Sequence, residues 1–530
     1  MTTPGRSRYL GWLDRPAPRP LTWLVIAGLL ATPAFLWSDA LRSPWLKLDD
    51  FVYLAGSRTG ADLRANLLLP HNAHVVPLYR LLTAGVLLVS GSLASLPLAT
   101  TLASYAALVL AMAGVGILVR RETGDGGWGM GAMAVVGLSS ILDPTVAWYS
   151  AAQALWAGSA TVAVLLALEQ WKATGKAGWL VLGFGLAAMA PAIWSGGYVA
   201  GPAGSAYLLT SGSRAARRGA AAPILGGVVF LGLSLAATGG GLSGTGRVEG
   251  SMQPLVGLRH TAQAIPEILV LANLGIDGVT TDHQGLGLLA LLTISWWWSR
   301  GRGGLSPLEA AGGTMAILGF GLAYTFRSNY RFDSLREIGW YQAIPQLGGV
   351  LFAAGWANHR RLSRGWSVSG PIRVASLLGV VASASLLAVI HAPRVERLFL
   401  ASLPPMSPQE AVGLPSPELK RLWGRYVADE RSARQTRYLG RLDRAGAIAE
   451  SLGASRQAIR GAVELRAGPG MPEAIPGLDA AGLLARPDLG GSEIDPSRLR
   501  SRLEGLVSVE PIPPSPLFSS DRAPLRAGEP

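Results

Sequence analysis

The chain contains no cysteine, and only 15% of its 530 residues are charged. The absence of cysteine excludes disulfides, thiolate nucleophiles and cysteine-ligated metals, although it does not identify the compartment. Soluble domains usually carry about 25% charged residues, and the deficit here is concentrated in the first three quarters, where long apolar runs recur. Because about 20 apolar residues span a bilayer, the sequence predicts an all-α, polytopic membrane protein.

Acidic residues are also scarce, with 33 against 46 basic residues and a formal net charge of +13. In a soluble protein this balance would suggest nucleic acid as a partner. Here the basic residues cluster in short segments between apolar runs, as in the cytoplasmic loops of membrane proteins. We therefore expect no nucleic-acid partner, a location in the cytoplasmic (inner) membrane, and a cytoplasmic N-terminus before an uncleaved first span.

Alternating Lys/Arg clusters predict about eleven spans. They cover residues 21–37, 96–119, 128–142, 151–168, 178–194, 196–209, 221–237, 284–298, 308–326, 338–356 and 372–391. Two helices are expected to lie at the outer interface: residues 75–89, apolar except for Arg80, and the helical pattern from Leu255 to Ile268, which Pro266 should kink or end.

Three regions are expected along the chain. Residues 1–391 form a multi-pass transmembrane domain whose outer loop, residues 38–95, holds the candidate active site. Residues 392–466 form a helical extracytoplasmic appendage, because apolar residues recur there at helical spacing. Residues 467–530 are rich in Pro, Gly and Ser, which predicts a largely disordered tail.

The outer loop combines an acidic pair, Asp49 and Asp50, with His71, His74 and Arg80. Transfer of a sugar from an anchored phosphate requires a carboxylate that removes the acceptor proton. It also requires cations that stabilise the departing phosphate. The acidic pair could provide the base, and two carboxylates facing one site would raise one pKa by repulsion. The candidates for phosphate or substrate binding are His71, His74, Arg80, Arg327, Arg331 and Arg336.

Each of these residues also has an ordinary structural interpretation. From position alone, a solvated polar edge is the more common role for such an acidic pair, and Arg80 could extend its head to the interface. His71 and His74 are three residues apart, which permits metal ligation from one helix face, but Pro70 and Pro77 disfavour a helix there. Hydrogen bonding to the loop or to lipid phosphate is therefore favoured over a metal. No cofactor is expected, and a divalent metal is allowed but not indicated.

Three stretches resemble the GT-C superfamily of polytopic glycosyltransferases, which includes protein O-mannosyltransferases, aminoarabinose transferases and uncharacterised bacterial members. Leu48-Asp49-Asp50-Phe51 follows the first span, His71 to Leu81 is similar to the "HNxHxxPLxRL" stretch of several members, and Leu142 to Trp148 is similar to an outer turn written "HPxxxEAVxW". The resemblance covers about the first 150 residues well, and beyond them it rests on general topology.

This resemblance implies a polyprenyl-phosphate-linked sugar as donor, an acceptor on the outer side, Asp49 as the general base and Asp50 in support. Two departures limit it. Asp143 stands where one branch has His, and the glutamate of that motif is missing. The tail also lacks that branch's tetratricopeptide pattern, so its acceptor preference does not carry over. The acceptor, whether glycan, lipid or protein, is therefore left open.

The sequence thus predicts a membrane glycosyltransferase that moves a sugar from polyprenyl phosphate to a hydroxyl or amine on the outer face. One alternative is a non-enzymatic transporter or flippase of lipid-linked or polar solutes; another is a catalytically inactive cell-envelope scaffold. Transporters tend to place ionisable groups at mid-membrane on broken helices. Here the predicted spans are nearly free of charge and the polar cluster lies in outer loops, which favours the enzyme.

Overall fold

The fold is given by a computed structural model, which is helical, without a strand, throughout the part of the chain that it describes. The described residues are 19–37, 41, 50, 53–54, 56–57, 59–71, 74–90, 95–237, 253–274, 282–300, 304–328, 332, 339–363 and 386. The all-α prediction is confirmed for these residues. The appendage at 392–466, the tail at 467–530 and, apart from residue 386, the eleventh predicted span lie outside them.

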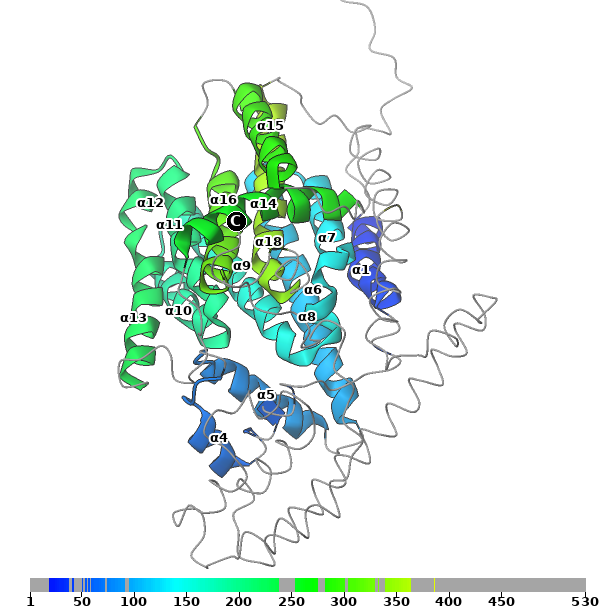
Figure 1. The fold of residues 1–530 in the computed structure, drawn as a ribbon. Coiled ribbons are helices and arrows are strands. Elements are labelled where there is room, and N and C mark those ends of the chain that lie inside the picture. Colours follow the sequence, from blue (N-terminus) through cyan, green and yellow to red (C-terminus); the bar gives the residue numbers. More distant parts are fainter. Residues whose placement is uncertain are drawn as a thin grey trace, which may run out of the picture.

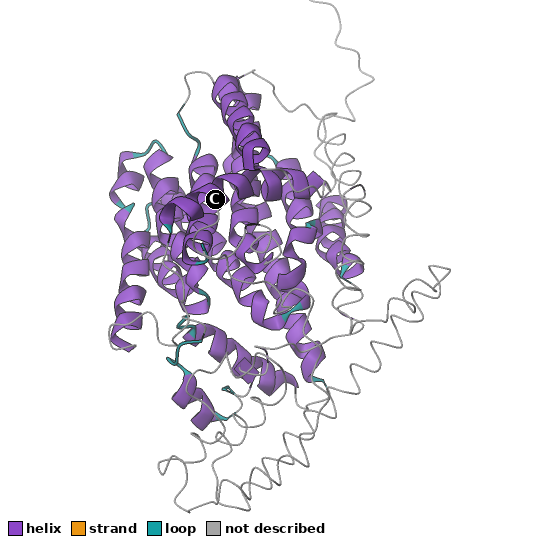
Figure 2. Ribbon diagram, viewed as in Figure 1, coloured by secondary structure: helices purple, strands orange, loops and turns teal. Residues whose placement is uncertain are grey.

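The helices follow the chain in a simple order (Figures 1 and 2). The α-helices are α1 (Arg19–Leu36), α4 (Gly60–Asn66), α5 (Pro77–Ser90), α6 (Leu96–Thr123), α7 (Gly126–Leu138), α8 (Asp143–Ala147), α9 (Tyr149–Thr174), α10 (Ala177–Ile193), α11 (Ala200–Thr210), α12 (Arg214–Arg218), α13 (Ala221–Ala237), α14 (Pro254–Pro266), α15 (Asp282–Arg300), α16 (Pro307–Phe326) and α18 (Ala343–Ser363). Short 3₁₀ or π turns are η2 (Ser140–Leu142), η3 (Ser195–Val199), η4 (Glu267–Leu271), η5 (Ala272–Leu274) and η6 (Gly339–Gln342).

Three helical segments are long and apolar enough to cross a bilayer: Leu96–Thr123, Tyr149–Thr174 and Ala216–Ala237. Four further apolar helices are shorter, at 10–17 residues, and one of them is the predicted interfacial helix Pro77–Ser90. The count of eleven spans therefore stays a prediction. It rests on the apolar runs and on the basic clusters between them in the sequence.

Local sequence signals explain where several helices begin and end. Asp125 begins α7 by accepting a hydrogen bond from the Gly127 amide at 2.8 Å. Ser306 and Glu309 form a reciprocal capping box at the start of α16. Gly124 and Gly175 follow α6 and α9 with φ values of 68° and 66°, a left-handed conformation that glycine adopts without steric cost. These caps separate the apolar helices into discrete elements.

Small residues allow the closest helix packing. A Cβ placed on Gly312 of α16 would lie 2.5 Å from the carbonyl oxygen of Gly348 on α18. The same holds for α6 and α7, where a Cβ on Gly129 would lie 2.6 Å from the carbonyl oxygen of Gly116. Close backbone approach through glycine is typical of helix pairs in membranes, where association depends on packing rather than on hydrophobic burial.

Several elements predicted to face outward contact one another. Helices α4 and α5 pack on each other at one end of α6, the lower end in Figure 1, and α5 also packs on α10. The turns between other helices meet as well, because η6 contacts η2, α8 and the start of α9, and η2 contacts η5. The fold thus brings together segments that basic clusters separate along the sequence.

Candidate functional site

The structure describes five of the eight residues that the sequence singles out. Asp50, His71, His74, Arg80 and Arg327 belong to the described chain. Asp49, Arg331 and Arg336 lie outside the described residues, so their predicted roles stay predictions. The five described residues are connected through a small set of hydroxyl and aromatic side chains.

Asp50 is fully buried against the N-terminus of α9. Its Oδ1 atom accepts a hydrogen bond from the backbone amide of Ser150 at 2.7 Å and a second, short one from the Ser150 hydroxyl. The first amides of a helix lack intrahelical acceptors and carry partial positive charge. Asp50 therefore acts as an N-terminal anchor for α9, supplied from 100 residues earlier in the chain.

Tyr53 extends this anchor by one helical turn. Its hydroxyl donates to Oε1 of Gln153 at 3.3 Å, and its ring meets His71 and Tyr79 edge-on at centroid distances of 5.0 and 5.2 Å. Ser150 and Gln153 are three residues apart on α9, so they lie on the same helix face. The first turn of α9 therefore holds the segment that follows the acidic pair.

Helix α5 is fastened to the same turn of α9. The Tyr79 hydroxyl donates to the backbone carbonyl of Tyr149, and the hydroxyls of Thr83 and Tyr149 lie 2.9 Å apart. Burial, followed by the neighbouring Tyr149, raises the pKa of Tyr79, so this phenol remains a neutral donor. The first turn of α9 thus fixes α5, and with it the position of Arg80.

Arg80 carries a buried cation without an anionic partner in the described chain. Its side chain is only 2% exposed, and its guanidinium carbon lies 5.5 Å from the ring centroid of Tyr53. Nη2 donates to the carbonyl of Leu69 at 3.3 Å, whereas Nε and Nη1 are covered and have no hydrogen-bond partner. Burial lowers the pKa of Arg80, and Tyr53 opposes this shift. The head group is therefore covered by protein atoms, and it does not extend from the surface of the protein as the interface alternative required.

The two histidines form a tight turn, as the flanking prolines predicted, rather than a helix. The amide of each donates to the carbonyl of the other, at 2.9 and 2.8 Å. His71 is buried against Tyr53, whereas Nδ1 of His74 lies 2.8 Å from Oγ of Ser195 in η3. Among the described residues, no group of three or more His, Cys, Asp or Glu side chains is arranged to hold a metal.

Arg327 approaches the same region from the C-terminal end of α16. Its Nε donates to the hydroxyl of Tyr341 at 3.0 Å. The Tyr341 ring stacks on Trp194, with centroids 6.2 Å apart and ring planes 20° apart, and Trp194 meets His74 edge-on at 6.5 Å. A continuous row of contacts therefore runs from His74 to Arg327.

Sequence reasoning missed the residues that make these connections. They are Ser150, Gln153, Trp194, Ser195 and Tyr341. The available signal was their position, because each lies within a few residues of a predicted outer end of a span. The third stretch of the resemblance forms η2 and α8, and its Trp148 meets Trp340 edge-on at 5.0 Å. The stretch therefore borders the site through aromatic packing.

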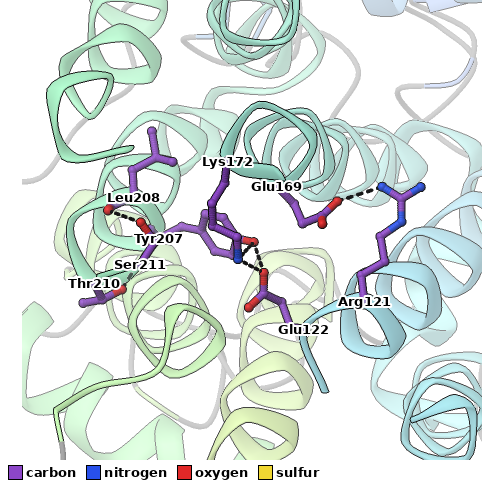
Figure 3. A network of polar contacts seen from close by, with 8 residues as sticks. All are labelled: Arg121, Glu122, Glu169, Lys172, Tyr207, Leu208, Thr210 and Ser211. Carbon is purple, nitrogen blue, oxygen red and sulfur yellow. Dashed lines mark hydrogen bonds and ion pairs between the residues drawn. The ribbon is translucent and has the colours of Figure 1, made fainter. Parts of the chain in front are cut away.

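A second polar cluster lies near the far end of α6, which has 28 residues and is therefore about 42 Å long. Glu122 accepts hydrogen bonds from Lys172 and from the Tyr207 hydroxyl, and Arg121 pairs with Glu169 at 2.8 Å (Figure 3). The cluster joins α6, α9 and α11, and each carboxylate has a cationic partner. It stabilises helix packing rather than offering an unpaired group for chemistry.

Comparisons with protein-family models, with curated proteins and with solved structures found no match to this chain. The function of this chain is therefore inferred from its own residues and their geometry. The most informative of these residues is Arg80, whose charge the described chain leaves without an anion.

Proposed function

We propose that the chain is a polytopic membrane glycosyltransferase of the GT-C type. It transfers a sugar from a polyprenyl-phosphate donor to a hydroxyl or amine of a glycan, lipid or protein acceptor on the outer face of the cytoplasmic membrane. Three features support this proposal: apolar helices long enough to cross a bilayer, an acidic pair next to the first of the predicted outer elements, and cations gathered at the same end of the bundle.

The single observation that carries the proposal is the unpaired guanidinium of Arg80. Burying an ionised group costs several kcal/mol in proteins unless an opposite charge compensates it. Nε and Nη1 have no partner, so an anionic ligand would remove this penalty, and a phosphate matches the planar fork of donors. Because protein atoms cover both nitrogens, the phosphate reaches them only after local rearrangement of the surrounding residues.

Within this proposal the two acids have different roles. Asp49 is the general base that removes the acceptor proton, a role that rests on the resemblance. Asp50 positions it, because its Oδ1 atom is held by the amide and hydroxyl of Ser150. His71 and His74 orient the phosphate or the acceptor, and Arg327, Arg331 and Arg336 approach from the far loop.

A transfer assay tests the proposal directly. The full chain would be purified in lipid nanodiscs and supplied with a panel of radiolabelled polyprenyl-phosphate sugars and membrane extract as acceptor. Asp49→Asn should abolish transfer, and Arg80→Met should reduce it at least about a hundredfold, because the developing phosphate charge loses its cation. Arg64→Gln, which removes an exposed arginine on neighbouring α4, should leave transfer unchanged.

Stability measurements on the same variants separate binding from folding. Because Arg80 is buried without an anion, Arg80→Met should leave the ligand-free protein at least as stable as wild type. Added polyprenyl phosphate should raise the unfolding midpoint of wild type and of Arg64→Gln but not of Arg80→Met. Full transfer by a well-folded Asp49→Asn protein, or equal stabilisation of Arg80→Met by polyprenyl phosphate, would contradict the proposal.

A further inference from the structure

The turn between α10 and α11 contributes a side chain to the site that the sequence did not reveal. This turn comprises Trp194, Ser195, Gly196 and Gly197. The Ser195 hydroxyl lies 2.8 Å from Nδ1 of His74, across 121 residues of sequence. A hydroxyl and an imidazole nitrogen at this distance form a full hydrogen bond.

The backbone of this turn is shaped to hold that contact. A Cβ at Gly196 would lie 2.1 Å from the Trp194 ring, and a Cβ at Gly197 would lie 2.3 Å from the backbone of Ala190. Only glycine therefore allows the Trp194 ring to fold over the turn and the turn to pack on α10. The two neighbours of His74, Ser195 and Trp194, are fixed by this packing.

The two glycines explain how a serine at the end of one helix reaches a distant histidine. Trp194 is 5% exposed and contacts both the His74 ring and the Tyr341 ring. Its indole limits where the imidazole can lie, while Ser195 engages Nδ1. The imidazole is thus restrained by a ring contact and by a hydrogen bond to one specified nitrogen.

We infer that Ser195 is a positioning residue that fixes the orientation of the His74 ring by engaging Nδ1. The hydrogen bond made by one ring nitrogen determines the protonation of the other. If the serine hydroxyl donates, Nε2 carries the proton and is a donor; if Nδ1 donates, Nε2 is an acceptor. The inference deepens the proposed function, because His74 is one of the residues assigned to orient phosphate or acceptor.

Nitrogen-15 NMR of the imidazoles tests this inference without any transfer assay. The chain has only six histidines, and the His74 signals can be assigned from their loss in His74→Gln. Wild type should show the Nδ1 signal of His74 at the position of a hydrogen-bonded nitrogen. Ser195→Ala should shift that Nδ1 signal, because the nitrogen loses its hydrogen bond to the hydroxyl, and Ser195→Thr, which retains a hydroxyl, should restore the wild-type position. Ser211→Ala provides a control, because the Ser211 hydroxyl donates to the carbonyl of Leu208 rather than to a histidine.

Kinetics then link the restraint to the proposed reaction. Ser195→Ala should lower kcat about tenfold, a fraction of the effect of a positioned proton-transfer group, and Ser195→Thr should recover most of it. An unchanged His74 spectrum in Ser195→Ala would overturn the inference, as would a changed spectrum with an unchanged kcat. If wild type transfers no sugar, the proposed function fails, and the NMR comparison alone decides whether Ser195 fixes His74.

Discussion

At the residue scale, the site depends on a carboxylate that holds a helix terminus. Asp50 is completely buried, and it accepts two hydrogen bonds from Ser150, at the beginning of α9. Hydrogen bonds to an ionised acceptor contribute about 1.5–3 kcal/mol, roughly twice the contribution of neutral ones. The interaction therefore ties Asp50 to the start of α9.

A double-mutant cycle should reveal this coupling. Ser150→Ala removes the hydroxyl donor and should cost about 1 kcal/mol of unfolding free energy, whereas Asp50→Ala also leaves the Ser150 amide unsatisfied and should cost about 2–4 kcal/mol. The double variant should be less destabilised than the sum by about 1 kcal/mol, because the two residues share one interaction. Reversible denaturant unfolding in mixed micelles provides the measurement.

The control for this cycle is Ser104→Ala. Ser104 is fully buried like Asp50, but its hydroxyl donates only to the Thr100 carbonyl within α6. Combined with Asp50→Ala, it should show additive losses. Additivity of the Ser150 variant as well would remove the anchoring role of Asp50.

At the scale of secondary-structure elements, α16 and α18 depend on glycine for their packing. Gly312 and Gly348 approach so closely that a Cβ on either would meet the backbone of the other helix, at 2.5 and 2.6 Å. By contrast, a Cβ on the adjacent Gly313 would lie 3.5 Å from the Phe352 ring, an ordinary contact distance. Of these two consecutive glycines in α16, Gly312 leaves no room for a methyl group and Gly313 does.

Substituting these two glycines by alanine should change stability in opposite directions. Gly313→Ala should stabilise the protein by up to about 1 kcal/mol, because alanine has the higher helix propensity. Gly312→Ala should destabilise it by about 1–3 kcal/mol, because α16 and α18 must separate to accept the methyl group. Thermal unfolding in nanodiscs provides the measurement, and two equal shifts would show that the helices do not pack as closely as described.

The elements also show how far sequence reasoning reaches. Hydropathy and basic clusters located the longer helices of the described chain, and the flanking prolines correctly disfavoured a helix at His71 and His74. Pro266 ends α14 as expected, and the chain continues as a π turn. Periodicity could not predict that Ser150 meets Asp50 or that Ser195 meets His74, because those contacts join segments 100 and 121 residues apart. Such pairings arise from helix packing, which leaves no local pattern in the sequence.

At the scale of the whole molecule, two groups of charged residues lie at opposite ends of the helices α6 and α9. Asp50 and Arg80 lie where α5 meets the start of α9. The paired acids Glu122 and Glu169, by contrast, lie near the other ends of α6 and α9 with their cations (Figure 3). Exposed arginines, including Arg217 on α12, lie at the same end as Glu122 and Glu169, because α12 packs on α9 and α11. The positive-inside rule predicts that this end faces the cytoplasm and that the proposed site faces outward.

The lack of cysteine makes this orientation directly testable, because single cysteines can be introduced without first removing native ones. Arg64 on α4 and Arg217 on α12 are both exposed, and the proposed topology places them on opposite sides of the membrane. In spheroplasts, a membrane-impermeant maleimide should label Arg64→Cys at once and Arg217→Cys only after permeabilisation. Equal labelling of both in intact spheroplasts would place them on one side, and Asp50 and Arg80 would then have no defined outward-facing site for a lipid-linked donor.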